Sequence, residues 1–128
     1  MAKSDAFPQT FRTLRGLLEK HRGRMMVVAD TPVDYSIASP DMVDRSGRPV
    51  FVAAVQIKKS YVSFHLMPVY MNPALLESLS PALRKRMQGK SCFNFVTIEP
   101  ADARELSAVT RKGIAGFKDL KLPWARPV

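Results

Sequence analysis

The chain contains a single cysteine, Cys92, and only two histidines, His21 and His65. One cysteine cannot form a disulfide within the chain, and no cysteines and histidines have the spacing of a structural zinc site. We therefore expect a protein of a reducing compartment, the cytoplasm, without a bound metal or cofactor.

Long apolar runs are also missing. The longest, VFVAAV at residues 50–55, is far shorter than the ~20 residues that span a bilayer. The chain does not open with a basic segment followed by an apolar one, so the sequence predicts neither a membrane contact nor a secretory signal.

Acidic residues are scarce, with 11 against 20 basic ones and a net charge of +9. This excess predicts attraction to polyanions such as nucleic acid, although a solvated basic surface has the same composition. The densest basic run, RKRMQGK, supplies Arg84, Lys85, Arg86 and Lys90. A second basic cluster follows near the C-terminus, made of Arg111, Lys112, Lys118 and Lys121. The sequence shows neither a helix-turn-helix nor a paired aromatic motif for RNA, so nucleic-acid binding would not read sequence.

What is present suits one globular domain, because 46% of the 128 residues are hydrophobic. We expect a loose leader at residues 1–9, an α+β domain at 10–118 and an irregular tail at 119–128. Helical spacing of apolar residues predicts a helix that starts at Thr10 and stops before Gly23, where His21 adds a cation near the C-terminus. A helix from Pro100 to about Lys118 is predicted at the other end.

Between these helices the pattern predicts strands at 25–29, buried, and at 33–38, then a loop at 39–49. Short helices follow from Pro73 and from Pro81 to Gly89, with Asn72 and Ser80 as N-caps, and a last strand covers 91–98. This order predicts an antiparallel sheet with both terminal helices on one face and two short helices inserted before the last strand.

The most regular stretch is a predicted hairpin over residues 51–66. A turn at Lys59-Ser60 would pair Ile57 with Val62 and Ala53 with Leu66, which gives one apolar face. The members of that face are Phe51, Ala53, Val55, Ile57, Val62, Phe64 and Leu66.

His65 falls on the opposite face of this hairpin, beside Ala54. It is either a general acid–base or ligand-binding group, or a polar residue of an exposed face. Pockets are apolar with a few aimed polar groups, and the candidate members of a ligand-binding face are Tyr35, Gln56, Ser63, His65, Met67 and Tyr70, with Met71 nearby. The alternative is that Met67 and Tyr70 only fill space where the sheet meets a helix. Cys92 is either a reactive thiol near Lys90 or a buried cysteine.

A family resemblance is clearest over residues 58–95 and covers about residues 10–118 of the chain. The stretches GRPVFVAAVQIKKSYVSFH and GKSCFNF, with the helical segment between them, resemble the YdhG-like, frataxin-like family of small bacterial proteins. The resemblance implies a helix–sheet–helix sandwich, and one branch of that family implies iron handling through acidic surface residues. This chain has no row of Asp and Glu on its first helix, which departs from that pattern.

The sequence therefore favours a non-enzymatic protein, a monomer or homodimer, that binds a small ligand or a protein partner on the Tyr35/His65/Met67/Tyr70 face. Nonspecific polyanion binding by residues 84–90 is the alternative, and iron handling is the third. No nucleophile, base and orienting group can be assembled from the spacing, so an enzyme is the weaker expectation.

Overall fold

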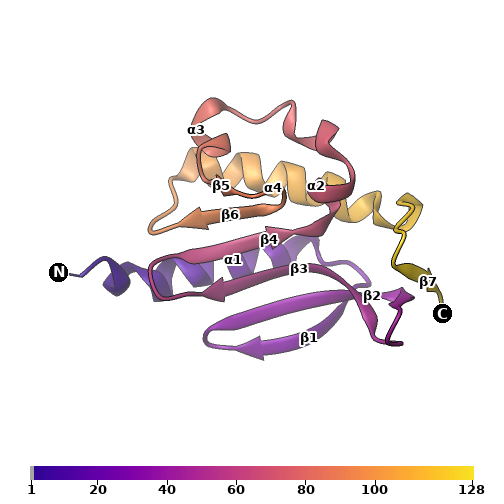
Figure 1. Cartoon of the computed structure of the whole chain (residues 1–128). Helices are drawn as coiled ribbons and strands as arrows, with labels where there is room; N and C mark the ends of the chain where they lie inside the picture. The colour runs from indigo at the N-terminus through magenta and orange to yellow at the C-terminus, as the bar shows by residue number, and fades with distance from the viewer. Residues whose placement is uncertain (1) are drawn as a thin grey trace.

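The computed structural model describes residues 2–128 and has two layers. A seven-stranded sheet forms one layer. Two helices, α1 (Phe7–His21) and α4 (Pro100–Ala115), lie side by side behind it (Figure 1). The predicted α+β fold, with both terminal helices on one face of the sheet, is confirmed.

All strands pair antiparallel. Across the sheet they run in the order β1 (Met26–Thr31), β2 (Asp34–Asp44), β3 (Pro49–Ile57), β4 (Val62–Leu66), β6 (Cys92–Phe95) and β5 (Met87–Gln88), and β7 (Ala125–Pro127) pairs with β2 outside this path. Short helical turns connect them: η1 (Lys3–Ala6), α2 (Met67–Met71), η2 (Pro73–Leu76), α3 (Pro81–Arg84) and η3 (Phe117–Asp119).

The predicted β3–β4 hairpin is confirmed, including its register. Ala53 pairs with Leu66, Ala54 with His65 and Ile57 with Val62. The Lys58 amide donates to the Tyr61 carbonyl at 2.8 Å, which closes the turn at Lys59-Ser60. Alternation of apolar and polar residues fixed this register because a one-residue slip would bury the polar set.

Phe51 is a correction to the predicted apolar face. Ile37 pairs with Ala53 whereas Ala38 pairs with Phe51, so β3 carries one extra residue, Val52. A bulge of this kind reverses the alternation beyond it. Val52 therefore enters the core, and the Phe51 ring lies on the outer face with its centroid 4.8 Å from that of His65.

The predicted burial of the first strand is also wrong. β1 is the edge of the sheet, and its Met26, Val27 and Val28 are 38%, 40% and 53% exposed. Their apolar run resembles that of a central strand, and only the strand order shows that one side of β1 has no neighbour within residues 2–128.

The predicted loop at 39–49 and the predicted irregular tail at 119–128 both contain strand residues, and these strands pair with each other. β2 continues to Asp44, and Met42 pairs with Pro127 of β7. Pro40 is tolerated because β2 and β3 separate between Ala38 and Val43, so the missing N–H removes no bond of that ladder.

Two helix boundaries differ from the prediction. α1 begins at Phe7, inside the expected leader, because the Phe7 ring is buried in the core and Pro8 suits a first turn. Thr10 is no N-cap, since its hydroxyl donates to the Val96 carbonyl at 2.7 Å. α4 ends at Ala115, before the expected Lys118.

The helix expected at 81–89 is a single turn. After Arg84 the chain leaves the helix, and Met87 pairs with Phe93 of β6. Gly89, expected as a helix cap, has φ 75° in the β5–β6 turn instead. The positive φ of Gly89 therefore serves the turn between two strands and not the end of a helix.

Candidate functional site

The structure divides the predicted ligand-binding residues among three places. Tyr35 pairs with Val55 and is 1% exposed in the core, where the Arg15 guanidinium lies 4.6 Å from its ring centroid. His65 lies on the other side of the sheet, so the expected grouping of Tyr35 with His65 is wrong. The sequence placed Tyr35 on a half-buried strand but could not show that α1 covers its side.

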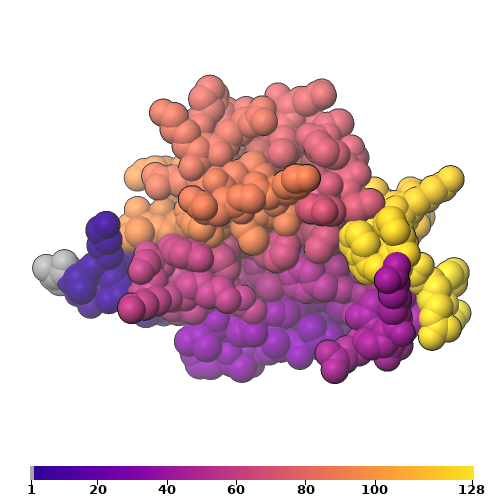
Figure 2. All heavy atoms as spheres, in the orientation of Figure 1, coloured from indigo at the N-terminus to yellow at the C-terminus, as the bar shows by residue number. Residues whose placement is uncertain are grey.

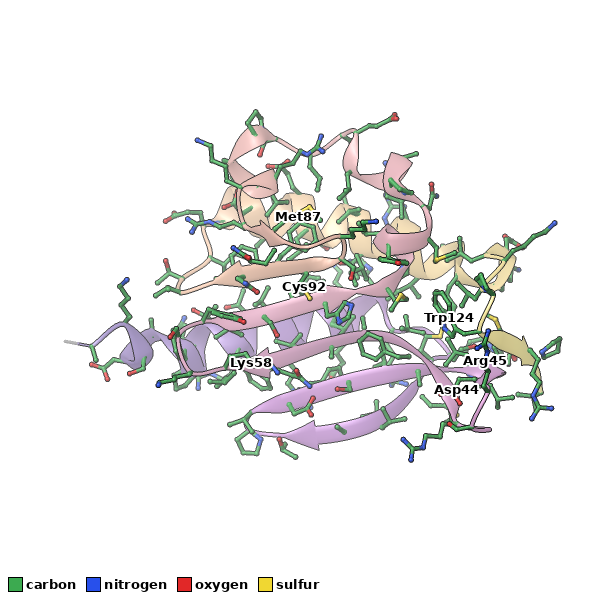
Figure 3. All side chains as sticks on the ribbon, in the orientation of Figure 1. Asp44, Arg45, Lys58, Met87, Cys92 and Trp124 are labelled. Atoms are coloured by element: carbon green, nitrogen blue, oxygen red, sulfur yellow. The ribbon has the colours of Figure 1, made fainter. Side chains whose placement is uncertain are left out.

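Gln56, Ser63 and His65 do lie together, as predicted, on the outer face of the sheet. Cross-strand pairs set Ser63 beside Gln56 and Asn94, and His65 beside Ala54 and Cys92. We call these residues, with Phe51, the His65 face. Figure 3 views this side, with Lys58 and Cys92 labelled, and none of the described elements crosses in front of it. Ala54 and Ser63 are nevertheless buried, because larger neighbouring side chains shield these two small ones from solvent.

The chemistry of the His65 face favours uncharged groups. His65 Nε2 and Ser91 Oγ are 2.8 Å apart, and burial lowers the pKa of His65. Burial also raises the pKa of the Cys92 thiol, although the Lys58 charge acts in the opposite sense. A thiolate–imidazolium pair would need a lowered thiol pKa and a raised histidine pKa, the opposite of both directions found here. This face therefore offers neutral hydrogen-bonding groups.

Met67 and Tyr70 both belong to α2, but their side chains lie in different environments. Met67 packs against the core, which is the space-filling role considered as the alternative. Tyr70 is 44% exposed. It lines a hollow of about 610 Å³. We call this hollow the Tyr70 groove, and its walls include Tyr70, Met71, Leu76, Arg84, Met87 and Lys90.

The Tyr70 groove joins two predictions that the sequence kept apart, the aromatic candidate and the basic run. Arg84, Lys85, Arg86 and Lys90 are all exposed. Arg84 and Lys90 line the groove, and Lys90 Nζ lies 5.7 Å from the Tyr70 ring centroid. Figure 2 shows the segment from α2 to β5 standing above β6 at the top of the molecule.

Arg84 is held by α3, whose N-cap is Ser80 as predicted. The Leu83 amide donates to Ser80 Oγ at 3.3 Å. Both Ser80 N and Ser80 Oγ donate to the Glu105 carboxylate on α4, at 2.7 and 2.8 Å. These bonds lower the pKa of Glu105. Glu105 is thus engaged with Ser80, and the described walls of the groove contain no acidic side chain.

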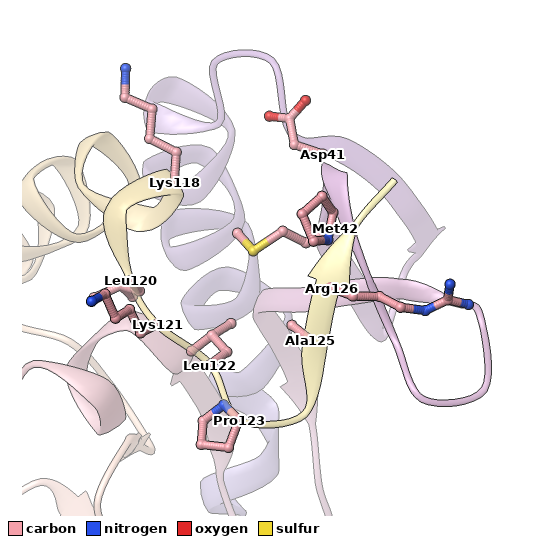
Figure 4. A pocket seen from close by; sticks show the side chains of 10 residues that line it. Asp41, Met42, Lys118, Leu120, Lys121, Leu122, Pro123, Ala125 and Arg126 are labelled. Carbon is pink, nitrogen blue, oxygen red and sulfur yellow. The ribbon is translucent and has the colours of Figure 1, made fainter.

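A second basic hollow lies at the other end of the molecule. The sequence found the cluster of Arg111, Lys112, Lys118 and Lys121, but not the residues that join it from α1. His21, Arg22 and Arg24 line a hollow of 360 Å³ together with Arg111 and Lys118. Lys118 and Asp41 also line an adjoining hollow of 490 Å³ between the tail and β2, which Figure 4 shows with Lys121 and Arg126 at its rim.

His21 differs from its expected role as a cation at the end of a helix. Its Nε2 lies 2.7 Å from Ser107 Oγ on α4. Burial, together with the charges of Lys20 and Arg111, lowers the pKa of His21. The ring therefore favours its neutral form and links the two helices.

In comparisons with known proteins, no family model, no curated protein and no solved structure matches this chain. The resemblance to the YdhG-like family stays a prediction. In the part of the chain that the structure describes, no helix is both long and apolar enough to cross a membrane. Within residues 2–128, no three His, Cys, Asp or Glu side chains gather as metal ligands would.

Proposed function

We propose that this protein binds polyanionic strands, single-stranded nucleic acid in particular, without reading sequence, and that the Tyr70 groove is the contact. The supporting observation is an exposed aromatic ring set among cations: Tyr70 lies beside Lys90, and Arg84 lines the same groove. Bases stack on aromatic side chains while nearby Lys and Arg neutralise the backbone.

The groove fits one nucleotide-sized unit, since ligand sites typically enclose about 300–1,000 Å³ and this one encloses 610 Å³. Lys85 and Arg86 extend the basic surface beyond its walls. None of these four cations takes part in an ion pair among the described residues, so their charge is available to phosphates.

The test is fluorescence anisotropy of a labelled oligothymidine at low and moderate salt. Single-strand contacts give a log–log salt slope of about −0.7 per phosphate neutralised, so four cations predict a slope of about −2 to −3. The double variant Arg84→Gln/Lys90→Gln should flatten the slope and weaken binding. Arg12→Gln/Lys20→Gln is the matched control, because both residues are exposed on α1 and the charge change is the same. Absence of binding at low salt, or equal loss in both double variants, would reject the proposal.

The His65 face supports a second candidate function, contact with a protein partner or a second copy of the chain. The observation that favours it is a broad sheet surface with a floor of small residues, Ala54 and Ser63, left uncovered by the described elements. Ser63→Arg would fill that floor. If a partner or a second copy binds there, native mass spectrometry of gently purified protein should show added mass that this variant loses. A bare monomer in both forms would rule the candidate out.

A further inference from the structure

The 360 Å³ hollow between the C-terminal ends of α1 and α4 concentrates positive charge in a way that the Tyr70 groove does not explain. We call it the Arg111 pocket. Its charged walls are Arg22, Arg24, Arg111 and Lys118, with Asp41 as the one acidic residue. Asp41 forms an ion pair with Arg24. Three cations therefore face the pocket with no carboxylate partner among residues 2–128.

Arg22 is held in place before any ligand arrives. Its Nη1 donates to the Met25 carbonyl at 2.9 Å, which fixes the guanidinium against the chain that follows α1. Its Nε is buried without an acceptor in the described structure. A buried donor of this kind needs an explanation, and a bound anion that draws the guanidinium toward itself is one.

Helix dipoles do not account for the whole cluster. Cations near the last turn of a helix are stabilising, which covers Arg22 and Arg111. Arg24 and Lys118 lie beyond the ends of α1 and α4, yet they converge on the same hollow. The Asp41 carboxylate offsets the charge of Arg24, and the mutual repulsion of the other three cations would be reduced by a further anion.

We infer that the Arg111 pocket binds a compact anionic group, a phosphate or carboxylate, carried by a small molecule. Arginine forks match both groups bidentately. The apolar floor, Met25 and Ile114, and the adjoining hollow behind Lys118 leave room for the rest of the molecule. This site is separate from the Tyr70 groove in residues and in the size of its ligand.

Inorganic phosphate is the probe, titrated into ¹⁵N-labelled protein at constant ionic strength and followed by NMR. We expect saturable shifts of the Gly23 amide and of the Arg22 Nε–H resonance. Arg111→Gln should weaken phosphate binding about tenfold, the value of one charge-assisted hydrogen bond. Lys112→Gln is the matched control, because Lys112 is the exposed neighbour on α4 and does not line the pocket.

Shifts that stay linear in phosphate, that centre on residues 84–90, or that are weakened equally by the two variants would overturn the inference. The oligonucleotide assay distinguishes failure of this inference from failure of the proposed function. Arg111→Gln should leave oligothymidine binding unchanged, and Arg84→Gln/Lys90→Gln should leave the phosphate affinity of the Arg111 pocket unchanged. The affinities of phenyl phosphate and benzoate are then compared, and the probe that binds more tightly shows whether phosphate or carboxylate is the preferred group.

Discussion

Gly113 of α4 and Pro68 of α2 pack so closely that a Cβ at Gly113 would lie 3.0 Å from the Pro68 Cβ. The same added atom would lie 3.7 Å from Leu75 Cδ1. The helix that supports the Tyr70 groove thus meets α4 at a residue without a side chain.

Gly113→Ala should therefore destabilise the protein by about 1–2 kcal/mol, because overpacking outweighs the gain in helix propensity. Gly16→Ala is the control, since Gly16 is exposed in α1 and its added Cβ meets nothing within 4 Å. That variant should gain up to about 1 kcal/mol. Urea unfolding of both measures the difference, and a stabilised Gly113→Ala would contradict the close packing.

Thr10→Val should lower the free energy of unfolding by about 1 kcal/mol, because the Val96 carbonyl loses its hydrogen bond from Thr10. The change barely affects helix propensity. Thr13→Val, at an exposed position of the same helix, should stay within about 0.5 kcal/mol of wild type. Equal unfolding midpoints for the two variants would show that the bond to Val96 contributes nothing.

Stability should fall as the pH drops below the ordinary pKa of histidine, about 6.5. Burial lowers the pKa of His65 in the folded protein, so the unfolded chain binds its proton first. Stability is then complete above the unfolded pKa and declines as the pH falls toward the folded one. The lowered pKa of His21 contributes in the same direction.

His65→Gln should flatten this decline below about pH 6.5, and His21→Gln should remove a separate part of it. Denaturant unfolding at several pH values measures both. A His65→Gln protein with the same pH dependence as wild type would mean that burial does not shift this histidine.

Tyr70→Leu should weaken binding of the oligothymidine at least about fivefold, because stacking contributes about 1–3 kcal/mol per base. Tyr61→Leu is the control, since Tyr61 is 36% exposed in the β3–β4 turn and outside the Tyr70 groove. If both variants bind as tightly as wild type, the groove does not stack bases.

The sequence by itself determined the class of fold and the register of the β3–β4 hairpin. Both follow from periodicity, because alternation along a strand and helical spacing along a helix decide which side chains can be buried together. It also placed Gln56, Ser63 and His65 on one face, since that follows from the register alone.

Only the tertiary structure decided the rest. The bulge at Val52 turned Phe51 toward His65, and pairing between β5 and β6 ended the expected helix at Arg84. Local periodicity does not fix such features, because a bulge depends on the partner strand β2 and a two-residue strand such as β5 is too short to show an alternation. The sequence showed the basic run at 84–90 but not that α2 sets Tyr70 beside it. The Arg111 pocket needed the tertiary structure, because it forms where the ends of α1 and α4, distant in the chain, bring their basic side chains to one place.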